Sequence, residues 1–183
     1  MRRNSIISIE IDEVTPCLRR LSDGAILQTK SYKLNRLPEH VDFSQWGFDW
    51  PELFSDGYAI YTIKVEGDYR MQGLIALQDE PQNSLIRLQN VESAPFNNRH
   101  NRKVEGQEYA GVGAHLFALS CLISFQKGYG GYVSMMAKTQ LEKYYQDKLG
   151  AKRIGSSSLM YIDEVAARKL LVMYYGKDLH GRH

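Results

Sequence analysis

The sequence Glu108-Tyr-Ala-Gly-Val-Gly-Ala-His-Leu-Phe-Ala-Leu119 places two glycines directly before a long apolar segment. The segment continues to residue 127 with apolar side chains in nearly every direction, and Gly128 follows where helices commonly end. These residues predict a helix over residues 114–127 that is buried against a sheet. Gly111 and Gly113 then lie at its N-terminus, where backbone N–H groups lack acceptors and the helix dipole is positive.

The glycine pair admits two interpretations. Glycines at a helix start let an anion approach the backbone, but they also permit a tight turn and close strand–helix packing. Two nucleotide-binding patterns do not fit. A dinucleotide fingerprint needs a third glycine where Leu116 stands and an acidic residue where Lys138 stands. A P-loop needs Lys and then Ser or Thr where Val112 and Gly113 stand.

Short β-prone runs precede the helix. They cover residues 6–11, 59–65, 71–77 and 84–91, and they predict an antiparallel meander. Glu66-Gly67-Asp68 supplies the turn of the clearest hairpin. Residues 45–54 carry both tryptophans, in a loop or short helix. This aromatic cluster could line a substrate entrance, but anchoring a long loop onto the core is the simpler interpretation.

After the glycine-led helix the pattern predicts a strand at residues 132–137 and a second helix. Thr139 and Glu142 have the spacing of a capping box, and Gly150 ends that helix. A strand at residues 159–162 and a helix at residues 165–175 follow. We therefore expect a single α+β domain over residues 1–183, with a mixed, mostly antiparallel central sheet flanked by helices.

Composition excludes several classes of protein. Lys and Arg total 23 against 21 Asp and Glu, so the net charge of +2 indicates neither nucleic-acid nor membrane-surface binding. The apolar segments are too short to cross a bilayer and the N-terminus lacks a signal-peptide apolar region, so we expect a cytoplasmic protein. Cys17 and Cys121 match no metal motif, so no metal is expected and both cysteines should be reduced.

A larger pattern extends well past the glycines. A strand ending near Phe96, a Gly-x-Gly turn, an apolar helix, a short strand and a tyrosine-bearing helix closed by Lys148-Leu-Gly-Ala151 resemble the GNAT N-acetyltransferase superfamily. The resemblance covers about residues 59–162. The superfamily's phosphate-binding turn has the form (Gln/Arg)-x-x-Gly-x-(Gly/Ala). Residues 108–113 match this form except at the first position, where Glu108 replaces Gln or Arg. The segment of residues 97–107 is also longer than the usual link.

The resemblance implies an N-acetyltransferase that uses acetyl-CoA as co-substrate. The acetyl group would pass directly to an amine acceptor in a ternary complex, without a covalent enzyme intermediate. The sequence does not identify the acceptor, and residues 170–175 could form a homodimer interface. The implied cofactor-binding residues are Ser93, Ala94, Phe96 and Lys138 for pantetheine, and Tyr109, Ala110, Gly111, Val112, Gly113 and Ala114 for the pyrophosphate.

Direct transfer requires a base for the amine proton and an acid for the leaving thiolate. The superfamily's usual acid is a tyrosine on the helix before Leu-Gly, where Tyr144 and Tyr145 both stand. Adjacent helical residues diverge by about 100°, so only one can face the cofactor, and we favour Tyr145. Glu92 is the candidate base, acting through a water molecule; a surface or ion-paired carboxylate is the alternative. A CoA-binding or protein-interaction module without turnover is the rival function.

Overall fold

The computed structural model describes residues 17–98 and 106–176. The strand predicted at residues 6–11 lies outside them. The described strands are β1 Cys17–Arg20, β2 Ile26–Lys33, β3 Ala59–Val65, β4 Asp68–Glu80, β5 Leu85–Ser93, β6 Tyr109–Ala110, β7 Val133–Met136, β8 Lys152–Arg153 and β9 Leu159–Ile162. The α-helices are α1 Trp50–Ser55, α2 Val112–Gln126, α3 Thr139–Leu149 and α4 Glu164–Tyr175, and 3-10 turns cover Phe43–Gln45, Pro81–Asn83 and Pro95–Asn97.

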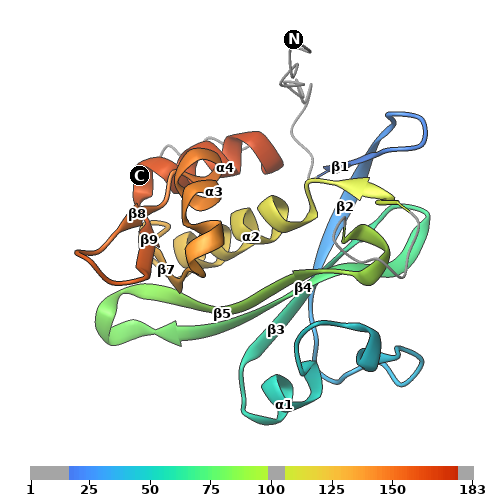
Figure 1. The fold of residues 1–183 in the computed structure, drawn as a ribbon, viewed down its shortest axis with the longest axis horizontal. Coiled ribbons are helices and arrows are strands. Elements are labelled where there is room, and N and C mark those ends of the chain that lie inside the picture. Colours follow the sequence, from blue (N-terminus) through green and yellow to red (C-terminus); the bar gives the residue numbers. More distant parts are fainter. Residues whose placement is uncertain (1–16, 99–105, 177–183) are drawn as a thin grey trace.

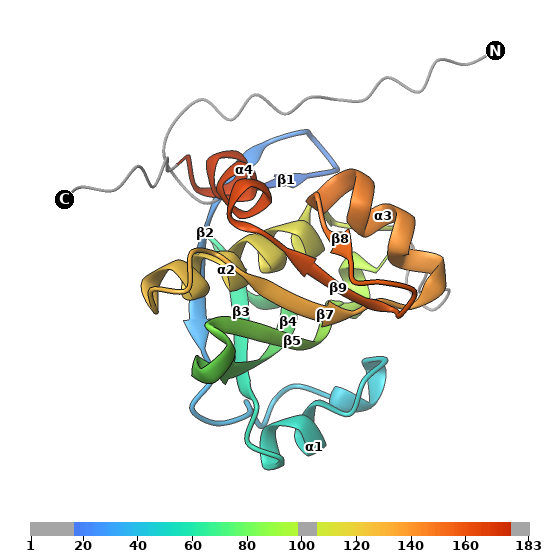
Figure 2. The ribbon, with the colours of Figure 1, turned by 90° about the vertical axis from the view of Figure 1, so that its left-hand side faces the viewer.

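The strands form one sheet in the order β6-β1-β2-β3-β4-β5-β7-β9-β8. Every neighbouring pair is antiparallel except β5 and β7, which are joined through α2 and run parallel. Helices α2, α3 and α4 cover one face, whereas α1 and its flanking loops cover the other (Figures 1 and 2). The predicted α+β class with a mixed, mostly antiparallel sheet is confirmed.

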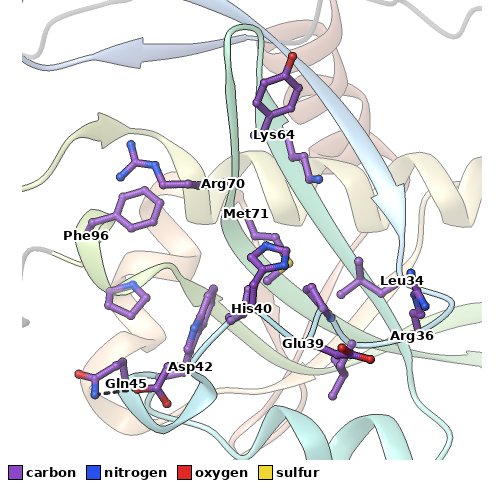
Figure 3. A pocket seen from close by; sticks show the side chains of 16 residues that line it. Leu34, Arg36, Glu39, His40, Asp42, Gln45, Lys64, Arg70, Met71 and Phe96 are labelled. Atoms are coloured by element: carbon purple, nitrogen blue, oxygen red, sulfur yellow. Dashed lines mark hydrogen bonds between the residues drawn. The ribbon is translucent and has the colours of Figure 1, made fainter.

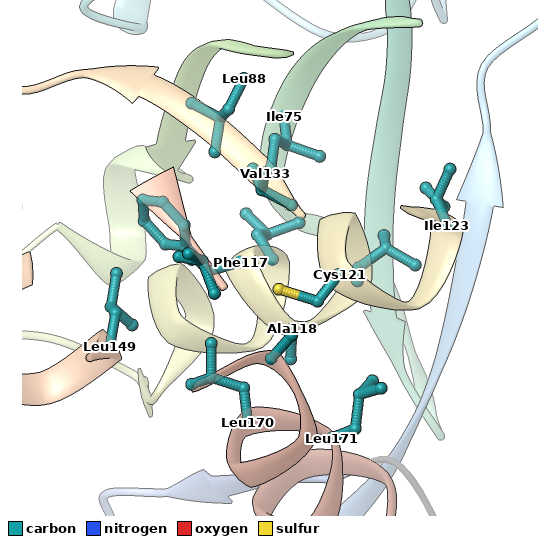
Figure 4. Packing of buried hydrophobic residues seen from close by; sticks show 14 of the residues in the cluster. Ile75, Leu88, Phe117, Ala118, Cys121, Ile123, Val133, Leu149, Leu170 and Leu171 are labelled. Carbon is teal, nitrogen blue, oxygen red and sulfur yellow. The ribbon is translucent and has the colours of Figure 1, made fainter. Parts of the chain in front are cut away.

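Helix α2 is the centre of the larger core. Its apolar side chains point both toward the sheet and toward α4, as Figure 4 shows, so the helix needs no polar face. Burial raises the pKa of the Cys121 thiol in this core to about 12, and the side chain packs as a small apolar group. The residues that surround α2 in the figure include Ile75, Leu88, Val133, Leu149, Leu170 and Leu171.

A second apolar cluster lies on the opposite face of the sheet. Trp50 is fully buried there with Ile60 and Leu74, and Trp46 and Phe48 pack around it. The Asp49 carboxylate caps α1 by accepting a hydrogen bond from the backbone N–H of Glu52 over 2.9 Å. The anchoring interpretation of the tryptophan segment is therefore confirmed for Trp50.

The predicted capping box at the start of α3 is wrong. Thr139 is already the first helical residue, and Lys138 occupies the N-cap position without a side-chain hydrogen bond. Glu142 forms an ion pair with Arg153 over 3.2 Å instead of reaching back to the helix start. Gly150 ends the helix as predicted, with a φ of 67° that favours glycine.

The apolar end of α4 is divided between the core and the surface. Leu170, Leu171 and Tyr175 are buried against α2, whereas the side chains of Val172 and Met173 are half exposed. Most of the segment considered as a dimer interface therefore packs within the molecule. Homodimerisation through its exposed side stays a prediction.

Candidate active site

Strands β5 and β7 diverge partway along β5. The two pair only from Ile86 to Leu88, whereas β5 continues along β4 as far as Ser93. The register against β4 shifts at Gln89, which has no partner there, and such a bulge bends a strand. Among the described residues, no strand pairs with the β7-facing edge of residues 89–93. An extended ligand could hydrogen-bond to this edge as an added strand would.

The glycine turn begins α2 beside the end of β5. Gly111 is the N-cap, with a φ of 90° that side chains rarely adopt, so the turn itself requires glycine. The backbone N–H groups of Val112, Gly113 and Ala114 follow, and they have no acceptor among the described residues. A Cβ added to Gly113 would meet nothing within 4 Å. The N-terminus of α2 therefore has three backbone N–H groups without acceptors among the described residues, with open space beside Gly113.

Gly73 on β4 explains how α2 comes so close to the sheet. A Cβ at this position would lie 2.7 Å from the Glu92 carbonyl oxygen and 2.8 Å from Val112 Cγ1. The end of β5 and the first turn of α2 thus meet over one glycine. This contact places the unpaired edge of β5 next to the N–H groups of the helix.

Tyr109 and Ala110 form the short strand β6 instead of part of the open turn. They pair with Arg20 and Arg19 on β1. The Tyr109 N–H donates to Asn97 Oδ1 over 2.9 Å, and its carbonyl accepts from Gln107. The Tyr109 hydroxyl donates to Asp68, and burial and that carboxylate raise its pKa. The backbone of Tyr109 is therefore engaged, and its predicted contact with pyrophosphate stays untested.

Sequence reasoning missed Asn97. This side chain is 2% exposed, and it donates to both the backbone carbonyl and the side-chain Oε1 of Gln72 while accepting from Tyr109. It therefore connects the segment after β5 to both β4 and β6. The sequence gives no signal for this role, because an asparagine in a polar loop reveals neither its burial nor its partners.

Glu108, the residue that departs from the expected Gln or Arg, forms an ion pair with Arg70 on β4. The Glu108 carboxylate accepts hydrogen bonds from the Arg70 guanidinium at 2.6 and 3.2 Å. Arg70 also binds Asp68 over 2.7 Å and lowers the pKa of that carboxyl group. Because Glu108 is ion-paired with Arg70, its negative charge is compensated at the position that precedes the glycine turn.

The three residues predicted to contact pantetheine after the bulge have different surroundings. Ser93 is half-buried and is the last residue of β5. Ala94 is fully buried, and its N–H donates to the Gln72 carbonyl. The ring of Phe96 lies under the Arg70 guanidinium, 4.1 Å from the ring centroid. Ser93 is thus the one of the three that lies on the unpaired edge of β5.

Glu92 faces the second cluster instead of α2. Its carboxylate accepts hydrogen bonds from the N–H groups of Gly47 and Phe48 at 2.5 and 3.3 Å, and from Trp50 Nε1 at 2.9 Å. The carboxylate therefore holds the loop of residues 46–50 against β5. These donors lie more than 40 residues away in sequence, so no local pattern could reveal them.

Tyr145 and Tyr144 differ in burial, although their rings are in edge contact with centroids 5.8 Å apart. The half-buried ring of Tyr145 packs 5.3 Å from the Phe117 ring in the core, and burial raises the pKa of its hydroxyl. Tyr144 is 40% exposed on the same helix. Within the described residues the Tyr145 hydroxyl makes no hydrogen bond, so it is available to donate one.

Lys138 lies at the junction of β7 and α3. Its exposed ammonium is 5.5 Å from the centroid of the Phe48 ring, which belongs to the loop held by Glu92. The loop of residues 46–50 therefore reaches from β5 to the start of α3, across the side on which the two strands diverge.

The described residues contain no group of three or more His, Cys, Asp or Glu side chains that could hold a metal ion. In the same part of the chain, no helix is both long and apolar enough to cross a membrane.

No family model matches the sequence, and no curated protein matches it. Several solved structures resemble the fold, and two of them are acetyltransferases. One is assigned as a streptothricin acetyltransferase from Bacillus anthracis strain Ames in complex with acetyl coenzyme A; it is 15% identical, with 81% of this chain and 82% of that chain covered and a TM-score of 0.39. The other, nourseothricin acetyltransferase, is 12% identical, with 81% of each chain covered and a TM-score of 0.37. Both likenesses are at low sequence identity and concern the fold alone.

Proposed function

We propose that this protein is an acetyl-CoA-dependent N-acetyltransferase that transfers the acetyl group directly to an amine. One observation carries the proposal: the unpaired edge of β5 ends beside an α2 N-terminus whose first three N–H groups have no acceptor among the described residues. An edge suited to an amide-bearing chain and an anion-binding helix start are the two features that a pantetheine–pyrophosphate ligand needs.

The residues of the chain divide the binding between them. Val112, Gly113 and Ala114 would donate backbone hydrogen bonds to the pyrophosphate, and Gly111 shapes the turn. Residues 89–93 would pair with the pantetheine amides, and the exposed Lys138 would contribute a polar contact. Tyr109, Ala110, Ala94 and Phe96 would support this surface from behind or beside it. Acetyl-CoA, when bound, supplies an acetyl group activated as a thioester.

Tyr145 and Glu92 are the proposed acid and base. The amine nitrogen forms a bond to the carbonyl carbon as the carbon–sulfur bond breaks. Glu92 takes the amine proton through a water molecule, and Tyr145 gives its hydroxyl proton to the departing sulfur. A raised pKa keeps Tyr145 protonated at neutral pH, as a general acid requires.

One observation favours a second candidate function. Because three loop donors already bind the Glu92 carboxylate, this side chain has a sufficient structural role without removing any proton. In a CoA-binding or protein-interaction module without turnover, Glu92 would only hold the loop of residues 46–50 against β5.

The two functions are separated by measuring binding and turnover on one preparation. Calorimetric titration with acetyl-CoA measures affinity, and a thiol reagent measures CoA release in the presence of a panel of primary amines. The proposed function predicts saturable binding together with amine-dependent thiol release. Binding without thiol release across the panel would favour the second candidate as a CoA-binding module. Absence of acetyl-CoA binding would refute the proposed function and leave the second candidate only as a protein-interaction module.

A further inference from the structure

A cavity of about 770 Å³ lies on the face of the sheet opposite α2, between the loop of residues 34–46 and the ends of β3 and β4. Figure 3 shows Met71 and His40 near its middle, Phe96 and Arg70 on one side, and Leu34 and Arg36 on the other. The volume suits a small organic molecule. Its half-buried walls are largely apolar and include Leu34, Leu37, Pro38, Val41, Trp46 and Phe96.

The charged groups of this cavity are concentrated on its rim. Arg36, Glu39 and Asp42 are all exposed, and so is Arg70. Asp42 is occupied by hydrogen bonds from Ser44 and Gln45. Glu39 is therefore the only lining carboxylate among the described residues without a hydrogen-bonded partner.

The balance of lining charges is unfavourable for a polycation. Arg36 and Lys64 line the cavity together with Glu39 and Asp42. The third lining cation, Arg70, is already paired with Asp68 and Glu108, so among the described residues only Glu39 is left to pair with a ligand ammonium group. A ligand with several ammonium groups would leave most of them without a counter-ion beside like charges, which costs binding free energy. A single ammonium on an apolar body matches one available carboxylate and an apolar interior.

Some residues that line the cavity adjoin the proposed site. Pro95 and Phe96, which line it, follow the end of β5 after Ala94. Trp46 lines it as well, and its ring lies 6.2 Å from that of Trp50, whose Nε1 donates to Glu92. The segment that forms one wall thus leads directly into the loop of residues 46–50, which Glu92 holds.

We propose that this cavity binds the acceptor of the reaction, and that the acceptor is a primary amine carrying one positive charge on an apolar body. The inference rests on the proposed function and narrows its substrate class: the site discriminates against polyamines and other polycationic amines. Apolar contact supplies the affinity, and Glu39 on the rim attracts the ammonium group.

The test compares hexylamine with 1,6-diaminohexane, which has the same chain and one more ammonium group. Calorimetric titration of the full-length protein, without acetyl-CoA, is expected to show hexylamine binding at least about tenfold more tightly than the diamine. Butylamine, two methylenes shorter, should bind roughly tenfold more weakly than hexylamine because each buried methylene adds about three- to fourfold in affinity. Equal or tighter binding of the diamine, or no saturable binding of hexylamine, would overturn the inference.

A pair of matched substitutions locates the binding. Val41→Trp places a large ring in the cavity, whereas Val165→Trp makes the same change at an α4 position that is 63% exposed. The first is expected to weaken hexylamine binding at least about tenfold and the second to leave it unchanged. Unchanged affinity in Val41→Trp would overturn the assignment of the cavity. Since no step needs acetyl transfer, a failed thiol-release assay would count against the proposed function and not against this binding result.

Discussion

The Arg70 guanidinium lies 2.6 Å from the Glu108 carboxylate. This ion pair joins β4 to the residue that directly precedes β6 and the glycine turn. The same guanidinium binds Asp68 and covers the ring of Phe96. One side chain therefore contacts three segments: the start of β4, the 3-10 turn after β5 and the approach to α2. It fixes the relative positions of a cavity wall and the candidate anion site.

The Arg70–Glu108 pair is expected to contribute modestly to stability. Both side chains are about half exposed, so solvent screening limits their coupling free energy to roughly 0.2–1 kcal/mol. Urea unfolding of Arg70→Ala, Glu108→Ala and the double variant would measure it as a double-mutant cycle. The coupling should shrink in 1 M salt. A coupling that is zero at low salt would show that the two residues do not stabilise each other in solution.

Gly113→Asp tests the anion site without straining the turn. Gly113 lies inside α2 and a new Cβ meets nothing within 4 Å, so both Asp and Ala should be accommodated. Ala should stabilise the helix by up to about 1 kcal/mol. The Asp carboxylate would occupy the space proposed for pyrophosphate and weaken acetyl-CoA binding at least about tenfold, or about 1.4 kcal/mol.

Calorimetry on both Gly113 variants gives the answer. If Gly113→Asp retained wild-type affinity, the helix start would not be the pyrophosphate site. Gly111 is the poorer probe because its φ of 90° makes any side chain costly there whether or not an anion binds.

Gly73→Ala should cost stability where Gly113→Ala does not. The added methyl group would clash with the Glu92 carbonyl and with side chains of Val112 and Leu116. Overpacking of this kind typically costs about 1–3 kcal/mol. The free energy of unfolding, compared with that of Gly113→Ala, measures the cost. A neutral effect would mean that α2 can move away from β5, contrary to the close contact on which the site depends.

Local sequence patterns predicted the regular elements well. Strand β3 has the predicted bounds at residues 59–65, and β9 has those at residues 159–162. Buried and half-buried side chains alternate along β9, and four of the seven side chains of β3 are buried. Strand β2 was missed because seven of its eight residues are exposed or half-buried, so it lacks an apolar face, and β8 has only two residues.

Long-range contacts were beyond the sequence patterns. The pairing of Glu108 with Arg70 spans 38 residues, and the contacts of Glu92 span 42 to 45. The capping box failed for a related reason: Thr139 and Glu142 have the correct spacing, but Arg153 offers Glu142 a better partner. The glycine turn was found because its signal is local, whereas the cavity is assembled from segments that only the fold brings together.

Glu92→Gln and Trp50→Phe distinguish two roles of Glu92: a catalytic base, or a structural residue that only holds the loop of residues 46–50. Each change removes part of the hydrogen bonding between β5 and the loop, and loss of bonds to a charged group should destabilise the protein by about 1–3 kcal/mol. Only Glu92→Gln also removes a proton acceptor. If Glu92 is the base, this variant loses turnover and the acidic limb of its pH–rate profile, whereas Trp50→Phe keeps that limb. Parallel losses in both variants, with unchanged pH profiles, would contradict the base assignment.

Tyr145→Phe tests the proposed acid, with Tyr144→Phe as its matched control on the same helix. The Tyr145 ring packs against Phe117, and its hydroxyl makes no hydrogen bond within the described residues, so removing that hydroxyl should leave the fold intact. We expect kcat for thiol release to fall by about 100-fold or more, as for loss of a general acid, while the acetyl-CoA Kd changes less than about twofold. The Tyr144 variant should keep both values, because its ring is 40% exposed and only contacts the Tyr145 ring edge to face, 5.8 Å between centroids. An unchanged rate in Tyr145→Phe together with a reduced rate in Tyr144→Phe would transfer the acid role to the neighbouring residue.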